Sequence, residues 1–228
     1  MKKTIYLSLI ILVFIGGLLE MGNLLNGAPK DRAIAIGYFA ALIYTLTFVF
    51  ILRNITQPFL RSFSRPQLLF VTIGSLGAIF VETVIWSAQT QLHTSGIAIH
   101  PNLLIDLIMT MPFYILLCYL LSKIVLNYSF SWPSIALAGG FYELIADGVV
   151  GNLFQLNITG VLISPLFLPI FIVFYSPIVL VPFLALRKNL NAAKIAQNKY
   201  LPLVKPIKAA LILPFSIGVG FLVAQILK

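Results

Sequence analysis

Long apolar runs separated by short polar segments make up most of this 228-residue chain. Each run is close to the ~20 residues that a helix needs to cross the hydrocarbon core of a bilayer. The pattern predicts an all-α fold, a polytopic transmembrane helical bundle of about seven spans that forms a single integral membrane domain over residues 1–228. The predicted spans are 4–20, 33–52, 68–88, 102–126, 134–153, 158–186 and 207–227.

Two lysines precede the first apolar run, as basic residues do in a signal peptide. No small-x-small cleavage site follows Gly16 and Gly17. We therefore expect this run to remain in the protein as the first span.

The sixth run is the longest and contains four prolines, which remove backbone donors and kink helices. They are Pro165, Pro169, Pro177 and Pro182. At ~1.5 Å per residue the run is too short for two full crossings. It therefore predicts one broken or strongly tilted helix.

The distribution of basic residues predicts the orientation. With the N-terminus in the cytoplasm, twelve of the fifteen Lys and Arg residues fall on the inner side, and only Lys30, Arg32 and Lys228 fall outside. This positive-inside bias predicts a cytoplasmic N-terminus and a C-terminus outside. The net charge of +9 then indicates anionic lipid at the cytoplasmic face as a partner, besides the bulk membrane lipids. No basic patch interleaved with aromatic residues indicates nucleic acid as a partner.

Composition and motifs exclude several classes of function. Hydrophobic residues make up 60% of the chain and charged residues 9%. Cys118 is the only cysteine, which excludes disulfides and Cys-based metal sites. The chain contains no Walker loop, dinucleotide fingerprint, HExxH helix or GxSxG elbow, so we expect no cofactor.

Four of the six acidic residues fall at nearly one depth when the predicted spans are laid across a bilayer. Glu20, Glu82, Asp106 and Asp147 lie roughly 20–24 Å above the inner surface of a core ~30 Å thick, each on a different helix. Glu143 lies one turn deeper. Carboxylates inside a membrane are costly and normally face the bundle interior or a wet cavity. The layer is therefore the predicted functional site, in the outer half of the membrane.

Small residues predict which way two of these helices face, because they mark the faces where transmembrane helices approach closely. On the fifth predicted span Glu143 and Asp147 share a stripe with Gly139 and Gly151. On the third, Gly74, Ala78, Glu82 and Trp86 share a stripe. We therefore expect Glu82 and Asp147 to approach each other across one helix–helix interface.

Structural explanations compete with the functional one at the two outermost acids. Glu20 ends its predicted span, where a terminal residue that reaches toward the interface is more often structural. Asp106 follows His100, Pro101 and Asn102 at a helix N-terminus, where an acid complements the helix dipole.

The candidate catalytic residues are Glu82, Glu143, Asp147 and Asp106, and the candidate substrate-binding residues are Trp86, Tyr142 and Asn152. No metal is predicted. His93 and His100 lie in the outer loop that joins the Glu82 and Asp106 helices, and their seven-residue spacing makes them only weak candidates for metal ligands.

Three functions are open, because carboxylates without nearby cations must be protonated, share a cation or be wetted by a channel. The first is an enzyme that uses acid–base chemistry on a lipid or isoprenoid substrate. The second is a transporter or substrate-capture subunit with a proton- or cation-linked site, against which stands the lack of a visible internal repeat. The third is a non-catalytic assembly or scaffold protein. We expect the plasma membrane of a prokaryote as the location.

Overall fold

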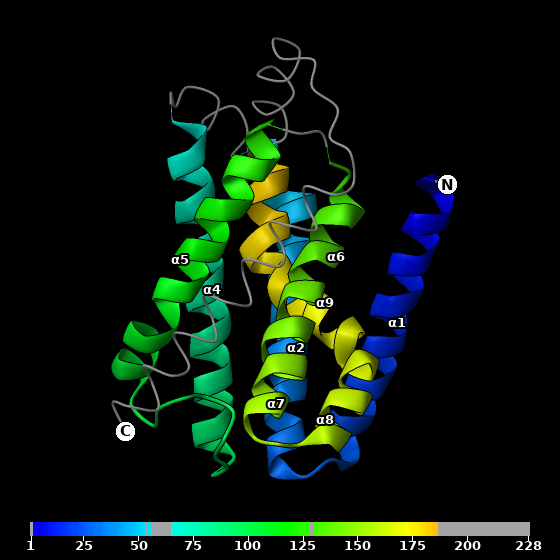
Figure 1. Ribbon diagram of the computed structural model, residues 1–228, viewed down its shortest axis with the longest axis vertical. Helices are drawn as coiled ribbons and strands as arrows, with labels where there is room; N and C mark the ends of the chain where they lie inside the picture. Colours follow the sequence, from blue (N-terminus) through cyan, green and yellow to red (C-terminus); the bar gives the residue numbers. More distant parts are fainter. Residues whose placement is uncertain (1, 53, 56–64, 128–129, 187–228) are drawn as a thin grey trace.

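The computed structural model describes residues 2–52, 54–55, 65–127 and 130–186, and all regular structure within these ranges is helical (Figure 1). The elements are α1 (Lys2–Asn26), α2 (Pro29–Thr47), η1 (Phe48–Leu52), α4 (Pro66–Gln91), α5 (Leu103–Asn127), α6 (Trp132–Glu143), η2 (Leu144–Gly151), α7 (Asn152–Phe154), α8 (Ile158–Ile163), η3 (Ser164–Phe167), α9 (Leu168–Tyr175) and η4 (Ser176–Leu180). Of these, η1, η2 and η4 are π-helical and η3 is a 3₁₀ helix.

Six stretches of helix in the described residues are long and apolar enough to cross a membrane, which is compatible with a multi-pass integral membrane protein. They are Tyr6–Asn26, Pro29–Leu52, Pro66–Gln91, Leu103–Leu126, Trp132–Gly151 and Ile158–Leu186. Apart from the end of the first, these helical stretches begin and end within a few residues of the first six predicted spans. The seventh predicted span, 207–227, lies outside the described residues.

The first span was predicted to end at Glu20, and that boundary is wrong. Helix α1 continues without interruption to Asn26, so Glu20 lies in its interior. The carboxylate of Glu20 is fully buried, and the Asn23 side chain one turn later hydrogen-bonds to it. A charged residue marks the end of a span only when it reaches water, and Glu20 does not.

The sixth span lies at the centre of the bundle. In its most apolar window 72% of the residues are buried, against 17% in the first span. Its segments α9 and η4 pack against α2 and α6, and α1 and α4 also pack on this span. Figure 1 shows it, in yellow to orange, running from α8 at the lower end of the view through α9 toward the upper end.

Proline breaks this central span into segments, as the sequence predicts. Pro165 lies in η3, Pro169 near the start of α9 and Pro177 in η4. Proline cannot donate to the carbonyl one turn earlier, and serine hydroxyls satisfy carbonyls at two of the breaks. The Ser176 hydroxyl donates to the Ile172 carbonyl (2.7 Å), and the Ser164 hydroxyl donates to the Val161 carbonyl (2.9 Å).

Glycines let the neighbouring helices approach this span closely. A Cβ atom added to Gly139 of α6 would lie 2.7 Å from Val179 Cγ2 and 2.9 Å from Tyr175 Cβ. One added to Gly74 of α4 would lie 2.6 Å from the Ile178 carbonyl oxygen. Side chains at these positions would overlap the central span. The prediction that these small residues face a helix–helix interface is confirmed.

The connection from α1 to α2, the loop from α4 to α5 and the turn from α7 to α8 lie at one end of the bundle (Figure 1). If the N-terminus is cytoplasmic, this end is the outer one. A cysteine at Lys30→Cys should then react with a membrane-impermeant thiol reagent from outside, whereas Lys123→Cys near the opposite end of α5 should not. Cys118 is buried and serves as the unlabelled background. Labelling of Lys123→Cys alone would reverse the topology.

Candidate functional site

Glu82 of α4 is paired with a tyrosine on the next span. The Tyr114 hydroxyl of α5 donates a hydrogen bond of 2.5 Å to Glu82 Oε1. The Glu82 side chain is only 9% exposed, since α4 packs tightly along α5. Bonds from a hydroxyl to a carboxylate are short and strong, so this contact holds the two spans in a defined register.

Glu143 of α6 is paired with a tyrosine in the same way. The Tyr175 hydroxyl donates a hydrogen bond of 2.5 Å to Glu143 Oε2. Glu143 is the last residue of α6, directly before the π-helical η2, and Tyr175 is the last residue of α9, directly before the π-helical η4. Short π-helical segments occur frequently at functional sites. Both members of this pair therefore lie where the helix geometry changes.

The two pairs meet through their aromatic rings. The ring centroids of Tyr114 and Tyr175 are 6.1 Å apart with the planes tilted by 54°, and the rings of Tyr142 and Tyr175 are 5.6 Å apart. A continuous chain of side chains thus runs from α4 through α5 and α9 to α6. We call Glu82, Tyr114, Tyr142, Glu143 and Tyr175 the carboxylate–tyrosine cluster.

The carboxylate–tyrosine cluster lies deep in the apolar part of the molecule. Counted at about 1.5 Å per residue, Glu82, Tyr114, Glu143 and Tyr175 each lie within roughly 5 Å of the midpoint of their spans. The central position predicted for Glu143 fits this count. A carboxylate held at such a depth by phenol donors can exist in two protonation states, and uptake of a proton removes a costly buried charge.

The two glutamate–tyrosine pairs follow a common sequence pattern, which the hydropathy and small-residue patterns do not reveal. Leu76, Phe80, Glu82, Phe113 and Tyr114 recur 61 positions later as Leu137, Phe141, Glu143, Phe174 and Tyr175. Each glutamate and its own tyrosine are separated by 32 positions. The α4–α5 hairpin and the hairpin from α6 to α9 therefore carry the same pair at the same places.

Asp147 belongs to η2, one turn after Glu143, but its side chain lies outside the described residues. Its expected approach to Glu82 therefore stays a prediction. In the described residues the connection from Glu82 leads through the two tyrosines to Glu143 instead.

Asp106 lies in the first turn of α5 and is fully buried. Its Oδ1 accepts a hydrogen bond of 3.0 Å from the backbone N–H of His100, so it fastens the preceding loop to the helix. Within the described part of the chain, its Oδ2 has no hydrogen-bond partner. This geometry agrees with the structural reading of Asp106 at a helix N-terminus, and its catalytic role stays a prediction.

The predicted substrate-binding residues make local contacts. The Trp86 indole donates to the Pro101 carbonyl (2.9 Å), which ties the loop between α4 and α5 to α4. The Asn152 amide donates to the Gly148 carbonyl (2.8 Å), and its oxygen accepts from the Asn157 side chain (2.9 Å). The third predicted residue, Tyr142, belongs to the carboxylate–tyrosine cluster through its ring contact with Tyr175.

The two histidines lie in the loop between α4 and α5. His93 has a positive φ of 49°, and the His100 ring accepts a hydrogen bond of 2.9 Å from the Asn102 backbone through Nδ1. Among the described residues, no group of three or more His, Cys, Asp or Glu side chains could hold a metal ion.

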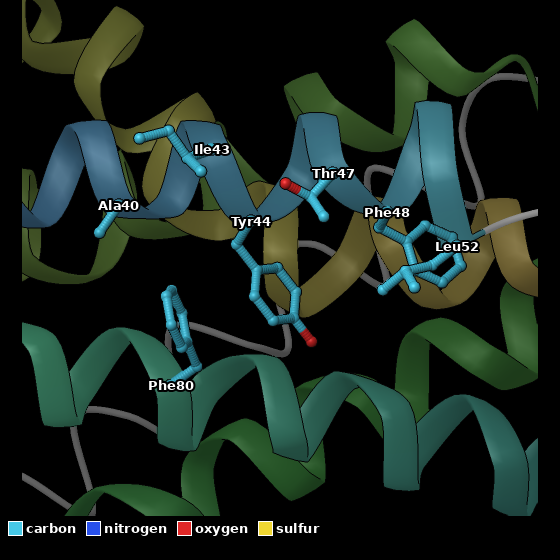
Figure 2. A pocket seen from close by; sticks show the side chains of 7 residues that line it. All are labelled: Ala40, Ile43, Tyr44, Thr47, Phe48, Leu52 and Phe80. Atoms are coloured by element: carbon cyan, nitrogen blue, oxygen red, sulfur yellow. The ribbon is translucent and has the colours of Figure 1, made fainter.

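An apolar cavity of about 380 Å³ lies on the side of the bundle, between α2 and α4 (Figure 2). It is lined by Ala40, Ile43, Tyr44, Thr47, Phe48, Leu52 and Phe80. The rings of Tyr44 and Phe80 stack within it at a centroid distance of 4.7 Å. Its lining holds no carboxylate, so this cavity and the carboxylate–tyrosine cluster are separate features.

Comparison with protein-family models, with curated proteins and with solved structures finds no match to this chain. The function is therefore argued from the carboxylate–tyrosine cluster and its place in the fold.

Proposed function

We propose that this protein is a proton-linked membrane transporter, with the carboxylate–tyrosine cluster as its intramembrane proton site. The observation that carries the proposal is the connection of Glu82 to Glu143 through two tyrosines whose rings meet near the middle of the spans. Carboxylates inside membrane spans characteristically relay protons in pumps and transporters.

The recurrence of the glutamate–tyrosine pair in two hairpins supports transport over the other functions. Transporters are commonly built from repeated hairpins, and their substrate and ion sites lie near the bilayer midplane where the repeats meet. Here Glu82–Tyr114 belongs to one hairpin and Glu143–Tyr175 to the other, and the Tyr114–Tyr175 contact joins them. In Figure 1, α4 and α6 run in one direction and α5 and α9 run in the other, so the two hairpins have the same orientation.

The broken central span supports the same proposal. Discontinuous helices commonly border transport sites, because they can rearrange with fewer lost hydrogen bonds than a continuous helix. Tyr175 stands at the junction of α9 and η4, so a change in the winding of η4 would move its hydroxyl relative to Glu143. Protonation of Glu143 and the shape of the central span are coupled in this proposal.

Proton chemistry fits the donors around these carboxylates better than a bound metal cation does. Each glutamate accepts a hydrogen bond from a phenol. A phenol hydroxyl can donate to the ionised carboxylate and can accept a hydrogen bond from the protonated carboxyl group, so it suits both forms. A proton gradient as driving force places the protein in a membrane that maintains one, and we propose the plasma membrane of a prokaryote. The acid–base enzyme and the scaffold protein stay predictions from the sequence.

The test is proton movement into liposomes that contain the purified protein and a trapped pH-sensitive dye, driven by a potassium diffusion potential. We expect wild type to acidify the lumen faster than empty liposomes, and Glu143→Gln to lower the rate at least tenfold, because the amide cannot bind the proton. Asp31→Asn, an exposed carboxylate at the start of α2, is the matched control and should keep the wild-type rate.

Three results would contradict the proposal. Equal rates in wild type and empty liposomes would exclude proton movement by the protein. An unchanged rate in Glu143→Gln would exclude the carboxylate–tyrosine cluster as the proton site. An equal loss in Asp31→Asn would show that the rate follows overall charge instead of this cluster.

A further inference from the structure

Helices α1 and α2 form the first of three hairpins in chain order, before α4–α5 and the hairpin from α6 to α9, and this first hairpin carries a third glutamate in a similar setting. Gly16-Gly17-Leu18-Leu19-Glu20 on α1 matches Gly139-Gly140-Phe141-Tyr142-Glu143 on α6, with two glycines, two apolar residues and a glutamate in the same order. Both segments lie on the first helix of a hairpin, and both helices pack against α9. Glu20 therefore occupies the position in its hairpin that Glu143 occupies in the third.

The glycines before Glu20 have the same use as those before Glu143. A Cβ atom on Gly16 would lie 3.1 Å from Pro169 Cβ of α9 and 3.1 Å from the Tyr38 hydroxyl of α2. One on Gly140 would lie 3.0 Å from the Ile172 backbone nitrogen of α9. In each case the missing side chain brings the glutamate-bearing helix directly against the central span.

Glu20 differs from the other two glutamates in its hydrogen bonding. Its side chain is fully buried, and Oε2 accepts a weak hydrogen bond of 3.3 Å from the Asn23 amide. Oε1 has no hydrogen-bond partner among the described residues. The nearby Tyr38 hydroxyl donates instead to the Val13 carbonyl (2.8 Å). A buried carboxylate that is charged and has one unpartnered oxygen is strongly unfavourable, because the ion loses its hydration without full compensation.

Among the described residues, no positive charge acts on the Glu20 carboxylate. Asp31 at the start of α2 acts on Glu20 as a like charge, and Tyr38 is the titratable neighbour on α2. The stretch 158–169 of the central span contains no titratable residue. We propose that Glu20 is a separate proton-binding site, which holds its proton on Oε1 as a neutral carboxylic acid at neutral pH.

Proton binding here joins one proton to the free Oε1 of the carboxylate and removes the net charge of the side chain. The Asn23 amide continues to donate to Oε2, so the acid form needs no rearrangement of α1. This site is independent of whether the protein moves protons across the membrane, because it follows from burial and hydrogen bonding alone.

The test is infrared difference spectroscopy of the full-length protein in liposomes, which detects the C=O stretch of protonated carboxyl groups. At neutral pH we expect wild type to show a protonated carboxyl band that shifts in D₂O and is absent from Glu20→Gln. Tyr119→Phe, at an exposed residue of α5, is the control and should keep the band. Asn23→Ala should keep the band at a shifted frequency, because the hydrogen bond to Oε2 is lost while the proton stays.

The thermal midpoint of Glu20→Gln shows whether a lost band comes from the loss of the proton site or from the loss of the fold. It should equal or exceed that of wild type, since a neutral amide replaces a neutral acid of the same shape. Wild-type spectra without a protonated band that depends on Glu20 would overturn the proposal, and so would wild-type stability that rises specifically with sodium. A Glu20 band together with no proton movement in liposomes would leave this site standing and overturn the transport function.

Discussion

Replacing Gly77 by alanine is expected to destabilise the protein by about 3 kcal/mol, because overpacking a well-packed interface costs of that order. A Cβ atom at Gly77 would overlap the Pro177 carbonyl oxygen and lie 2.7 Å from the Pro177 carbonyl carbon. Both are backbone atoms, so no rotation of a side chain can relieve the overlap. The contact joins α4 to η4, where the central span is already distorted by proline.

Gly22→Ala on α1 is the matched control. Nothing lies within 4 Å of a Cβ atom added there, and alanine is the better helix former by up to about 1 kcal/mol. The two substitutions are chemically identical and differ only in their surroundings. We therefore expect Gly77→Ala to lower the stability and Gly22→Ala to raise it. The measurement is the thermal midpoint of the purified protein in detergent. Equal midpoints for Gly77→Ala and wild type would show that α4 does not approach η4 as closely as the structure has it.

Replacing Tyr175 by phenylalanine is expected to lower proton movement into liposomes at least tenfold while leaving the ring contacts with Tyr114 and Tyr142 in place. The substitution removes only the hydroxyl that donates to Glu143. The buried, charged carboxylate of Glu143 then loses a hydrogen-bond donor, which costs roughly 1–3 kcal/mol. The proton site therefore loses both its donor and its connection to Tyr114.

Tyr119→Phe is the control, since this tyrosine is 40% exposed on α5 and lies outside the carboxylate–tyrosine cluster. It should keep the wild-type rate. The double variant Tyr175→Phe, Glu143→Gln should be no slower than Glu143→Gln alone, because residues that act as one unit show strongly non-additive effects. A further tenfold loss in the double variant would separate Tyr175 from Glu143 and contradict the pairing.

The sequence predicts the number and place of the described spans because crossing a membrane is a local property of length and apolar composition. It also predicts the faces of α4 and α6 that pack, since Gly74 and Gly139 mark close approach without reference to a partner. It fails at the end of α1. Whether Glu20 reaches water or the bundle interior depends on α2 and the central span, which a hydropathy pattern does not contain.

The candidate site likewise has some properties that are local to the sequence and others that depend on how the helices pack. The sequence by itself determined that Glu82 and Glu143 lie inside long apolar helices, on faces with small residues, because position and helix periodicity can be counted along the chain. Only the tertiary structure decided that each accepts a hydrogen bond from a tyrosine 32 positions away, and that these tyrosines touch. Hydrogen-bond partners between helices depend on how the spans rotate and pack against one another. Tyr114 and Tyr175 carry no local signal that distinguishes them from the other seven tyrosines of the chain.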